Sequence, residues 1–286
     1  MKTRAIGDRT VSEIGLGAMP MSIEGRPERQ RSIATVHASL EAGVTLIDTA
    51  DAYHLDASDV GHNEELVAEA LRSWGGGSEG VLVATKGGHL RPGGGRWTLD
   101  GRPEHLREAA RASARRLGVE AIGLYQFHRP DPAVPYADSV GALADLLDEG
   151  VIQMAGISNA DPGQIRQAND VLGGRLASVQ NQFSPAFRSS LPELEVCREL
   201  GVAFLPWSPL GGISSAGGLG EDHAAFAEVA REHGVSPQQV ALSWELSLAD
   251  VVVPIPGSSR PETARASAQA AELVLTPEEV TRLSAT

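Results

Sequence analysis

Four residues of this chain provide a carboxylate, a phenol, an amine and an imidazole in an order that suits proton transfer. Asp48 and Tyr53 belong to one short segment, Lys86 ends an apolar run, and His128 ends the next run. The chain contains two lysines against 22 arginines, so an amine at position 86 indicates a chemical role. Arginine keeps its proton in any protein environment, whereas lysine is a compact charge whose pKa responds to burial.

This set of side chains suits the reduction of a carbonyl group. Hydride addition needs a proton donor at the oxygen, because an alkoxide in a dry site is costly. An ordinary tyrosine has a pKa of about 10, and a neighbouring ammonium lowers that value. We therefore interpret Tyr53 as the acid, Lys86 as the cation that lowers its pKa, and Asp48 as the carboxylate that keeps Lys86 charged. His128 would orient the carbonyl or donate to its oxygen.

The elements that must position these residues form a repeating pattern. Eight short apolar runs, rich in β-branched residues, alternate with segments at helical period, as in parallel sheets buried on both faces. Eight units in about 250 residues favour a closed (β/α)8 TIM barrel, in which active sites lie at the carboxyl ends of the strands. The runs cover residues 13–17, 44–48, 81–86, 121–128, 151–158, 176–180, 202–207 and 251–255.

Other stretches complete the predicted architecture. Residues 2–11, with a turn at Gly7-Asp8-Arg9, indicate a short N-terminal β-hairpin that caps the bottom of the barrel. No linker or change of composition interrupts the chain, so we expect one domain over residues 1–286. The glycine-rich stretches 87–101 and 211–220 follow strands and are predicted to be mobile loops on the catalytic face.

At this point the chain resembles the aldo-keto reductase superfamily over essentially its whole length. Each matching motif is short, but eight of them occur in the right order at barrel spacings. The resemblance implies reversible, NAD(P)H-dependent reduction of an aldehyde or ketone, with Tyr53 as the proton donor. The motifs are Asp48-Thr49-Ala50 with Tyr53, Asn63-Glu64, Thr85-Lys86, His128, Gly156-Ile157-Ser158-Asn159, Gln180-Asn181-Gln182, Trp207-Ser208-Pro209-Leu210 and Ile255-Pro256-Gly257-Ser258.

The resemblance also implies a site for NADPH, with NADH as an alternative, and the chain has no Gly-x-Gly-x-x-Gly motif between a strand and a helix. Ser158, Asn159 and Gln180 would hold the carboxamide, and Trp207 would face the nicotinamide ring. The residues expected along the pyrophosphate and the 2′-phosphate are Ser208, Leu210, Gly212, Gly257, Ser258 and Arg260.

The chain departs from the family pattern at both ends of the predicted site. Gly257, Thr263 and the pair at 266–267 stand where many members have Lys, Arg and Glu-Asn, which leaves Arg260 as the main cation for the 2′-phosphate. The substrate pocket also departs, because many members have an aromatic residue near position 19. We expect its wall to comprise Met19, His54, Trp97 and Arg129. Because the chain ends ten residues after position 276, we expect an open pocket without a long C-terminal loop.

Two other functions are compatible with the same residues. A Schiff-base aldolase would use an uncharged Lys86 as its nucleophile, but Asp48 would keep that lysine protonated. A regulatory or redox-sensing subunit would bind NADPH without turning it over. Borohydride trapping on Lys86 would favour the first, and NADPH binding without turnover would favour the second.

Composition limits the class of partner. A net charge of −13 without a basic block argues against nucleic acid and anionic membranes as partners. No apolar run approaches the 18 residues of a membrane span, and no signal-peptide core is present. The single cysteine, Cys197, fits a reducing cytoplasm. We expect a cytoplasmic, bacterial protein, monomeric or a small homo-oligomer, that takes a small carbonyl substrate and no metal.

Overall fold

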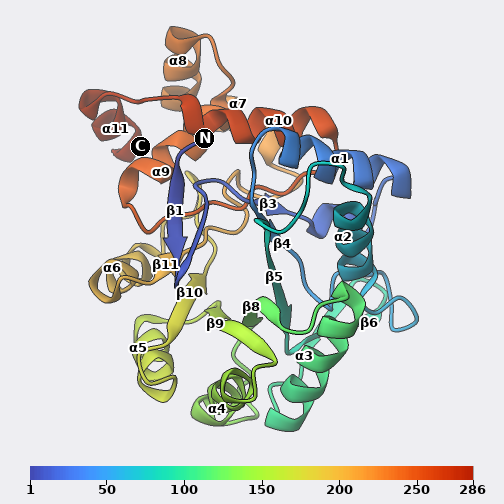
Figure 1. The fold of residues 1–286 in the computed structure, drawn as a ribbon. Helices are drawn as coiled ribbons and strands as arrows, with labels where there is room; N and C mark the ends of the chain where they lie inside the picture. The colour runs from blue at the N-terminus through green and yellow to red at the C-terminus, as the bar shows by residue number, and fades with distance from the viewer. Residues whose placement is uncertain (286) are drawn as a thin grey trace.

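The structure is a computed structural model that describes residues 1–285, and its centre is a curled parallel sheet (Figure 1). Seven strands follow the order β11-β10-β9-β8-β5-β4-β3. Each strand falls within a predicted apolar run or extends beyond it by at most one residue. Their bounds are β3 Leu16–Gly17, β4 Leu46–Asp48, β5 Leu82–Gly87, β8 Ile122–Phe127, β9 Ile152–Ser158, β10 Leu176–Gln180 and β11 Ala203–Phe204.

The eighth predicted run closes the sheet, although it forms no regular strand. Val252 makes a parallel bridge to Phe204 of β11, and Gly257 makes one to Gly17 of β3. Prolines at positions 254 and 256 lack the N–H that a continuous ladder requires, so the closure consists of isolated bridges. The predicted (β/α)8 barrel is therefore confirmed, with one strand reduced to an extended segment.

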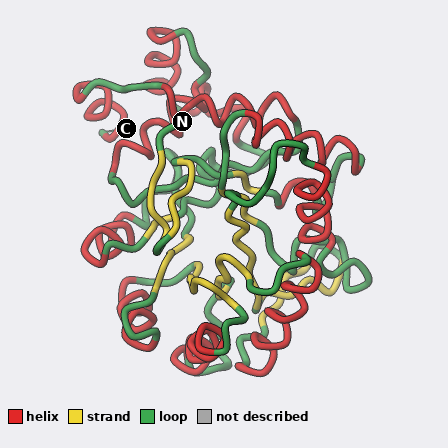
Figure 2. The backbone as a smooth tube through the Cα atoms, in the orientation of Figure 1, coloured by secondary structure: helices red, strands yellow, loops and turns green. Residues whose placement is uncertain are grey.

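Helices surround the barrel (Figures 1 and 2). Several begin at caps visible in the sequence: the side chains of Asp161, Ser236 and Thr276 each accept a hydrogen bond from the backbone three residues later. The helices are α1 Arg29–Glu41, α2 His62–Ser73, α3 Pro103–Leu117, α4 Tyr136–Asp148, α5 Pro162–Val171, α6 Leu191–Leu200, α7 Leu219–Asp222, α8 Ala224–His233, α9 Pro237–Leu248, α10 Pro261–Gln269 and α11 Pro277–Ser284, with 3-10 turns η1 Met19–Met21, η2 Ala216–Gly218 and η3 Ala270–Glu272.

The predicted N-terminal hairpin is present and packs on the barrel interior. Strands β1 (Thr3–Ile6) and β2 (Arg9–Ser12) pair in antiparallel register. Ile6 and Val11 are buried in the same apolar cluster as side chains from seven of the barrel segments. The turn glycine, Gly7, has a φ of 56°, and a Cβ there would lie 2.8 Å from the sulfur of Met154. The hairpin therefore closes one end of the barrel.

The two glycine-rich stretches are more regular than the sequence suggested. Residues 89–99 form an antiparallel hairpin of β6 (His89–Gly93) and β7 (Arg96–Leu99), joined where Gly93, Gly94 and Gly95 all have positive φ. The stretch 211–220 contains η2 and part of α7. The two stretches, which were predicted to be loops on the catalytic face, thus contain regular structure, and several of their glycines lie at turns with positive φ.

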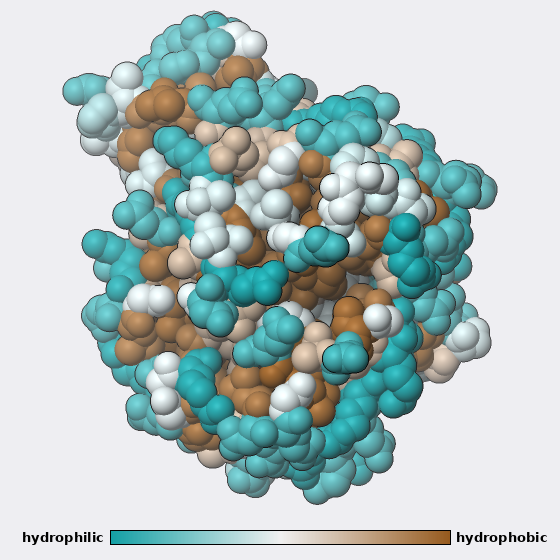
Figure 3. All heavy atoms as spheres, viewed as in Figure 1, coloured by the Kyte–Doolittle hydropathy of each residue, from teal (hydrophilic) through white to brown (hydrophobic). Residues whose placement is uncertain are grey.

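Apolar side chains are divided between the barrel interior and the layer between sheet and helices. The face shown in Figure 3 has hydrophilic side chains along most of its margin, with hydrophobic ones scattered between them. Within residues 1–285, none of the helices combines the length and the hydropathy that crossing a bilayer would need.

Candidate active site

Lys86 lies at the centre of a buried hydrogen-bonded cluster. Its Nζ donates to Oδ1 of Asp48 at 2.5 Å, to the hydroxyl of Tyr53 at 2.9 Å and to the backbone oxygen of Thr49 at 2.9 Å. The side chain of Lys86 is 0% exposed. Strand β5 delivers the lysine and β4 delivers Asp48, and these two strands are hydrogen-bonded neighbours. The fold thus brings together three of the four predicted catalytic residues.

The other oxygen of Asp48 is held by two amides. Gln180 Nε2, from β10, donates to Oδ2 at 2.7 Å, and Gln126 Nε2, from β8, donates to it at 3.3 Å. A buried carboxylate needs several such partners, because desolvation of an ion is costly. Lys86 and the two glutamines together therefore fix the orientation of the Asp48 carboxylate.

Burial and charge set the protonation of this cluster. Burial lowers the pKa of Lys86, but Asp48 and Tyr53 more than reverse this, so its pKa is raised. Burial raises the pKa of Tyr53, and the Lys86 ammonium opposes that shift without cancelling it. The pKa of His128 is well below its ordinary value, chiefly because the ring is buried and also because Lys86 lies near. At neutral pH the site therefore holds an ammonium, a phenol and an uncharged imidazole.

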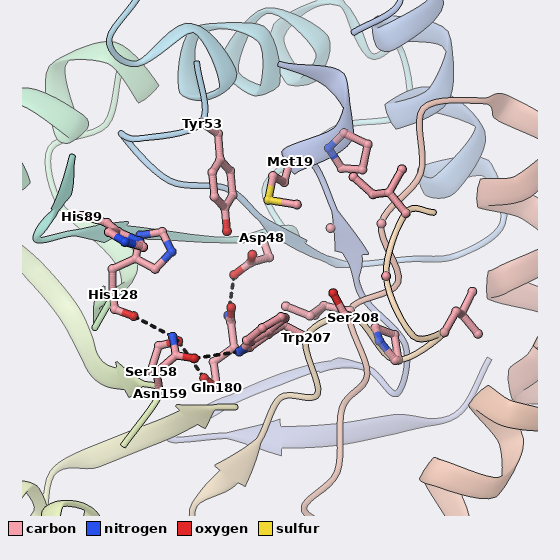
Figure 4. Close-up of a pocket in the computed structure, with 18 of the residues that line it drawn as sticks. Met19, Asp48, Tyr53, His89, His128, Ser158, Asn159, Gln180, Trp207 and Ser208 are labelled. Atoms are coloured by element: carbon pink, nitrogen blue, oxygen red, sulfur yellow. Dashed lines mark hydrogen bonds between the residues drawn. The ribbon is translucent and has the colours of Figure 1, made fainter. Parts of the chain in front are cut away.

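His128 follows β8 and lies beside Tyr53, with 5.7 Å between the two ring centroids. Its Nδ1 is buried without a hydrogen-bond partner among the described residues. Figure 4 shows the His128 ring on the same side of the cavity as the Tyr53 hydroxyl. The fourth predicted catalytic residue is therefore adjacent to the phenol.

A cavity of about 540 Å³ opens above this cluster at the carboxyl ends of the strands. That volume lies within the range typical of small-molecule sites. Most predicted site residues line it, and Lys86 lies beneath the surface. Its lining comprises Gly17, Met19, Pro20, Asp48, Tyr53, His89, Trp97, His128, Arg129, Ser158, Asn159, Gln180, Trp207, Ser208, Pro209, Leu210, Gly212, Ile213, Ala216, Ile255 and Gly257.

One wall of the cavity is built around Asn159 (Figure 4). Its Oδ1 accepts from Trp207 Nε1 at 3.2 Å, and its Nδ2 donates to the backbone oxygen of His128 and to Ser158 Oγ. Asn159 and Ser208 have φ values of 57° and 50°, which side chains other than glycine rarely adopt. Such backbone geometry clusters at functional sites. These hydrogen bonds fix the position of the Trp207 side chain, which lines the cavity.

Two predicted phosphate-binding residues lie outside the cavity lining. Ser258 is buried, and its Oγ is 2.5 Å from Thr263 Oγ1, one of the positions where the chain departs from the family pattern. Arg260 is exposed at the start of α10. Neither of these two side chains lines the cavity. Gly257, which precedes Ser258 in the chain and bridges to Gly17 of β3, does line it.

Three of the four residues predicted for the substrate pocket line the cavity: Met19, Trp97 and Arg129. His54 is not among the lining residues. Its side chain is buried, and its backbone oxygen accepts a hydrogen bond from Arg91 Nη1 at 2.5 Å. The segment turns after Tyr53, so successive side chains point in different directions.

Sequence reasoning missed His89 and Gln126. The ring of His89 packs against His128, with centroids 4.8 Å apart, and against Trp97, at 4.9 Å. Burial lowers its pKa to about 4. A usable signal was present, because His89 follows the end of β5 by only two residues. Gln126 was hidden because it lies inside a strand that otherwise reads as core.

The fold and the cavity define a (β/α)8-barrel protein with a ligand site at the carboxyl ends of its strands, and comparison with known proteins supplies the family. A model of the aldo/keto reductase family matches residues 13–286. An uncharacterized oxidoreductase of Schizosaccharomyces pombe is 35% identical over 285 residues, which cover 98% of this chain and 88% of that protein. A 6-dehydroglucose reductase of Novosphingobium aromaticivorans is 35% identical over 259 residues, covering 87% and 83%.

Solved structures agree. An aldo-keto reductase of Klebsiella pneumoniae, in complex with NADP and acetate, is 26% identical with a TM-score of 0.82, covering 100% of this chain and 95% of that one. The thermostable aldo-keto reductase Tm1743, in complex with the inhibitor epalrestat, has a TM-score of 0.83 at 25% identity, covering 100% and 99%. This chain belongs to the aldo/keto reductase family. The family uses NAD(P)H in oxidoreductase chemistry on carbonyl compounds.

Proposed function

We propose that this protein reduces an aldehyde or a ketone to the alcohol, reversibly, with NADPH as the hydride donor and NADH as the alternative. The observation that carries the proposal is the contact of the Lys86 ammonium with both Asp48 and Tyr53 directly beneath the cavity. The chain would act as a single domain over residues 1–286.

Each member of the cluster has one task. The Tyr53 hydroxyl donates its proton to the carbonyl oxygen, and Lys86 offsets the negative charge that remains on the phenolate. Asp48 keeps Lys86 protonated in a site where an isolated ammonium would lose its proton. The uncharged ring of His128 orients the carbonyl oxygen next to the phenol.

The residues of the Asn159 wall fit a nicotinamide dinucleotide, which when bound supplies the hydride. Trp207 offers a flat face that is fixed by its bond to Asn159. Gln180 uses only its Nε2 toward Asp48 and Gln126, so its Oε1 remains as an acceptor for a carboxamide NH2. Ser158 and Asn159 would hold the carboxamide together with Gln180. Ser208, Leu210, Gly212 and Gly257 would lie along the pyrophosphate, and Ser258 and Arg260 would meet the 2′-phosphate.

The aldolase alternative conflicts with the hydrogen bonds of Lys86. Its Nζ donates to three oxygens, which uses all three N–H bonds of an ammonium. A Schiff base needs a free electron pair on that nitrogen. A regulatory subunit that only binds NADPH would have no use for a phenol held against an ammonium.

The decisive experiment follows the absorbance of NADPH with a panel of aldehydes, ketones and sugars, with NADH in parallel. We expect turnover of at least one carbonyl class with NADPH. Tight binding of NADPH without turnover of any member would favour the regulatory alternative. Borohydride trapping of a substrate on Lys86 would favour the aldolase.

A further inference from the structure

Arg129 is a cation in the cavity wall with no acidic partner. It follows His128 directly after β8 and is partly buried. Burial lowers the pKa of its guanidinium, with no nearby carboxylate acting in the other direction. The only other charged residue in the lining is Asp48, which is already paired with Lys86. The described cavity therefore carries one uncompensated positive charge.

The nearest acid in sequence is engaged elsewhere. Asp131 accepts from the backbone N–H of Gly101 through Oδ2, at 2.8 Å, and from that of Ala133 through Oδ1, at 2.9 Å. Within residues 1–285, no ion pair or hydrogen bond of the Arg129 guanidinium is present. Its position next to the cavity thus leaves its N–H donors for a ligand.

Another arginine at the same mouth shows the contrast. Arg91 of β6 is buried, forms an ion pair with Glu24 and lies over the Trp97 ring, 4.8 Å from its centroid. A guanidinium taken out of water normally needs such an anion, because desolvation of the charge is costly. Arg91 has its anion within the protein, whereas Arg129 has none.

The surroundings of Arg129 suit an anionic ligand. His89 and His128 are both uncharged at neutral pH, so they do not compete with Arg129 for an anion. Other parts of the lining are apolar, with Met19, Pro20 and Trp97. An incoming anion would therefore find one strong site, since a guanidinium binds carboxylates and phosphates through two parallel hydrogen bonds.

We propose that Arg129 binds an anionic group of the substrate, so that this enzyme prefers aldehydes and ketones that carry a carboxylate or a phosphate. That the bound anion belongs to a carbonyl compound undergoing reduction rests on the proposed function. The Arg129 guanidinium helps to lower the pKa values of both His89 and His128, and all three residues line the cavity, so Arg129 and His128 serve the same end of it. A short acidic substrate would place its carbonyl at His128 and Tyr53 and its anion at Arg129.

The first test compares two substrates of one shape. Turnover with NADPH is measured for 4-carboxybenzaldehyde and for its methyl ester, in the wild type, in Arg129→Met and in Arg129→Lys. We expect the wild type to favour the acid by about tenfold in kcat/KM, the size of one charge-assisted contact. This ratio should fall to about one in Arg129→Met and recover in part in Arg129→Lys. Arg96→Met, which removes an exposed arginine of β7 outside the cavity lining, should keep the wild-type ratio.

The second test measures anion binding without turnover. Benzoate, phenyl phosphate and benzamide are titrated against the fluorescence of the tryptophans, two of which, Trp97 and Trp207, line the cavity. We expect the anions to bind more tightly than benzamide, by a margin that Arg129→Met removes. The tighter of the two anions identifies a carboxylate or a phosphate as the group recognised.

The outcomes separate this proposal from the proposed function. Anion binding that depends on Arg129, without reduction of any aldehyde, would uphold the role of Arg129 and refute the reductase. Reduction of both aldehydes with equal kcat/KM in the wild type would refute the role of Arg129 alone. A rise in the dissociation constant of NADPH in Arg129→Met, with the acid-to-ester ratio intact, would assign the arginine to the cofactor and overturn the proposal.

Discussion

Gln180 donates to Asp48 at 2.7 Å across 132 positions of the sequence, and this bond joins the buried catalytic cluster to the wall that we assign to the cofactor. One oxygen of Asp48 belongs to Lys86 and the other to the amides of Gln180 and Gln126. Gln180 also accepts, through its backbone oxygen, a 2.6 Å hydrogen bond from Ser158. The residues that we propose for the cofactor and for proton transfer therefore share one hydrogen-bonded network, and we expect a substitution in one group to affect the other.

Asp48→Asn tests the ion pair at the centre of that network. The variant leaves Lys86 buried without a counter-charge, so we expect a loss of about 3–5 kcal/mol in the free energy of unfolding. Urea denaturation followed by circular dichroism measures this. Asp8→Asn, at the exposed turn of the N-terminal hairpin, is the control and should change stability by less than about 0.5 kcal/mol. A similarly small change for Asp48→Asn would mean that the pair contributes little.

Tyr53→Phe removes only the hydroxyl that we propose as the proton donor. We expect the variant to bind NADPH with nearly the wild-type dissociation constant and to lose a factor of about 10²–10⁴ in kcat, the usual contribution of a general acid. Tyr125→Phe is a matched control, because its hydroxyl is also buried but donates to the backbone oxygen of Leu106 outside the cavity. Stopped-flow measurement of NADPH oxidation and fluorescence titration give the two quantities. Unchanged turnover in Tyr53→Phe would refute the proton-transfer mechanism.

The sequence located the ends of the strands well, because parallel strands in a barrel bring their carboxyl ends to one mouth. Lys86 and His128 were predicted from that rule, and both lie at the cavity or beneath it. The rule does not describe the loops and hairpins that follow the strands and fold over the open end of the barrel. His89 belongs to a hairpin that the sequence presents as a glycine-rich stretch, and its place beside His128 results from contacts distant in the chain.

The direction of individual side chains in loops was also beyond the sequence. His54 follows Tyr53 immediately, but a backbone turn buries its ring while the Tyr53 hydroxyl reaches Lys86. The sequence also did not reveal that the eighth segment forms no regular strand, and the reason here is different. The eighth run is apolar and β-branched, yet its prolines reduce it to single bridges, which only the neighbouring strands reveal.

Arg260→Ala tests the preference for NADPH. If Arg260 meets the 2′-phosphate, its removal should raise the dissociation constant of NADPH by roughly tenfold or more and leave that of NADH within about twofold, because only NADPH carries that group. Arg265→Ala on the same helix, where the arginine pairs with Glu41, is the control for a general loss of positive charge. Equal increases for the two cofactors, measured by fluorescence titration, would place Arg260 elsewhere.

We expect the buried carboxyl group of Glu245, in α9, to make the stability of the protein depend on pH. Its side chain is fully buried, both carboxylate oxygens lack a hydrogen-bond partner among the described residues, and burial raises its pKa well above the ordinary value. The folded state therefore keeps a proton that the unfolded chain releases above its pKa of about 4.3, so this group makes the protein less stable as pH rises, by up to about 1.4 kcal/mol per pH unit. Glu245→Gln keeps the shape of the side chain and removes its titration.

Denaturant unfolding between pH 5 and pH 8 measures the effect. As pH rises, the free energy of unfolding of Glu245→Gln should increase relative to that of the wild type, whereas Glu262→Gln, on the exposed face of α10, should follow the wild type. Parallel profiles for wild type and Glu245→Gln would show that Glu245 is ionised in the folded protein and has found a partner.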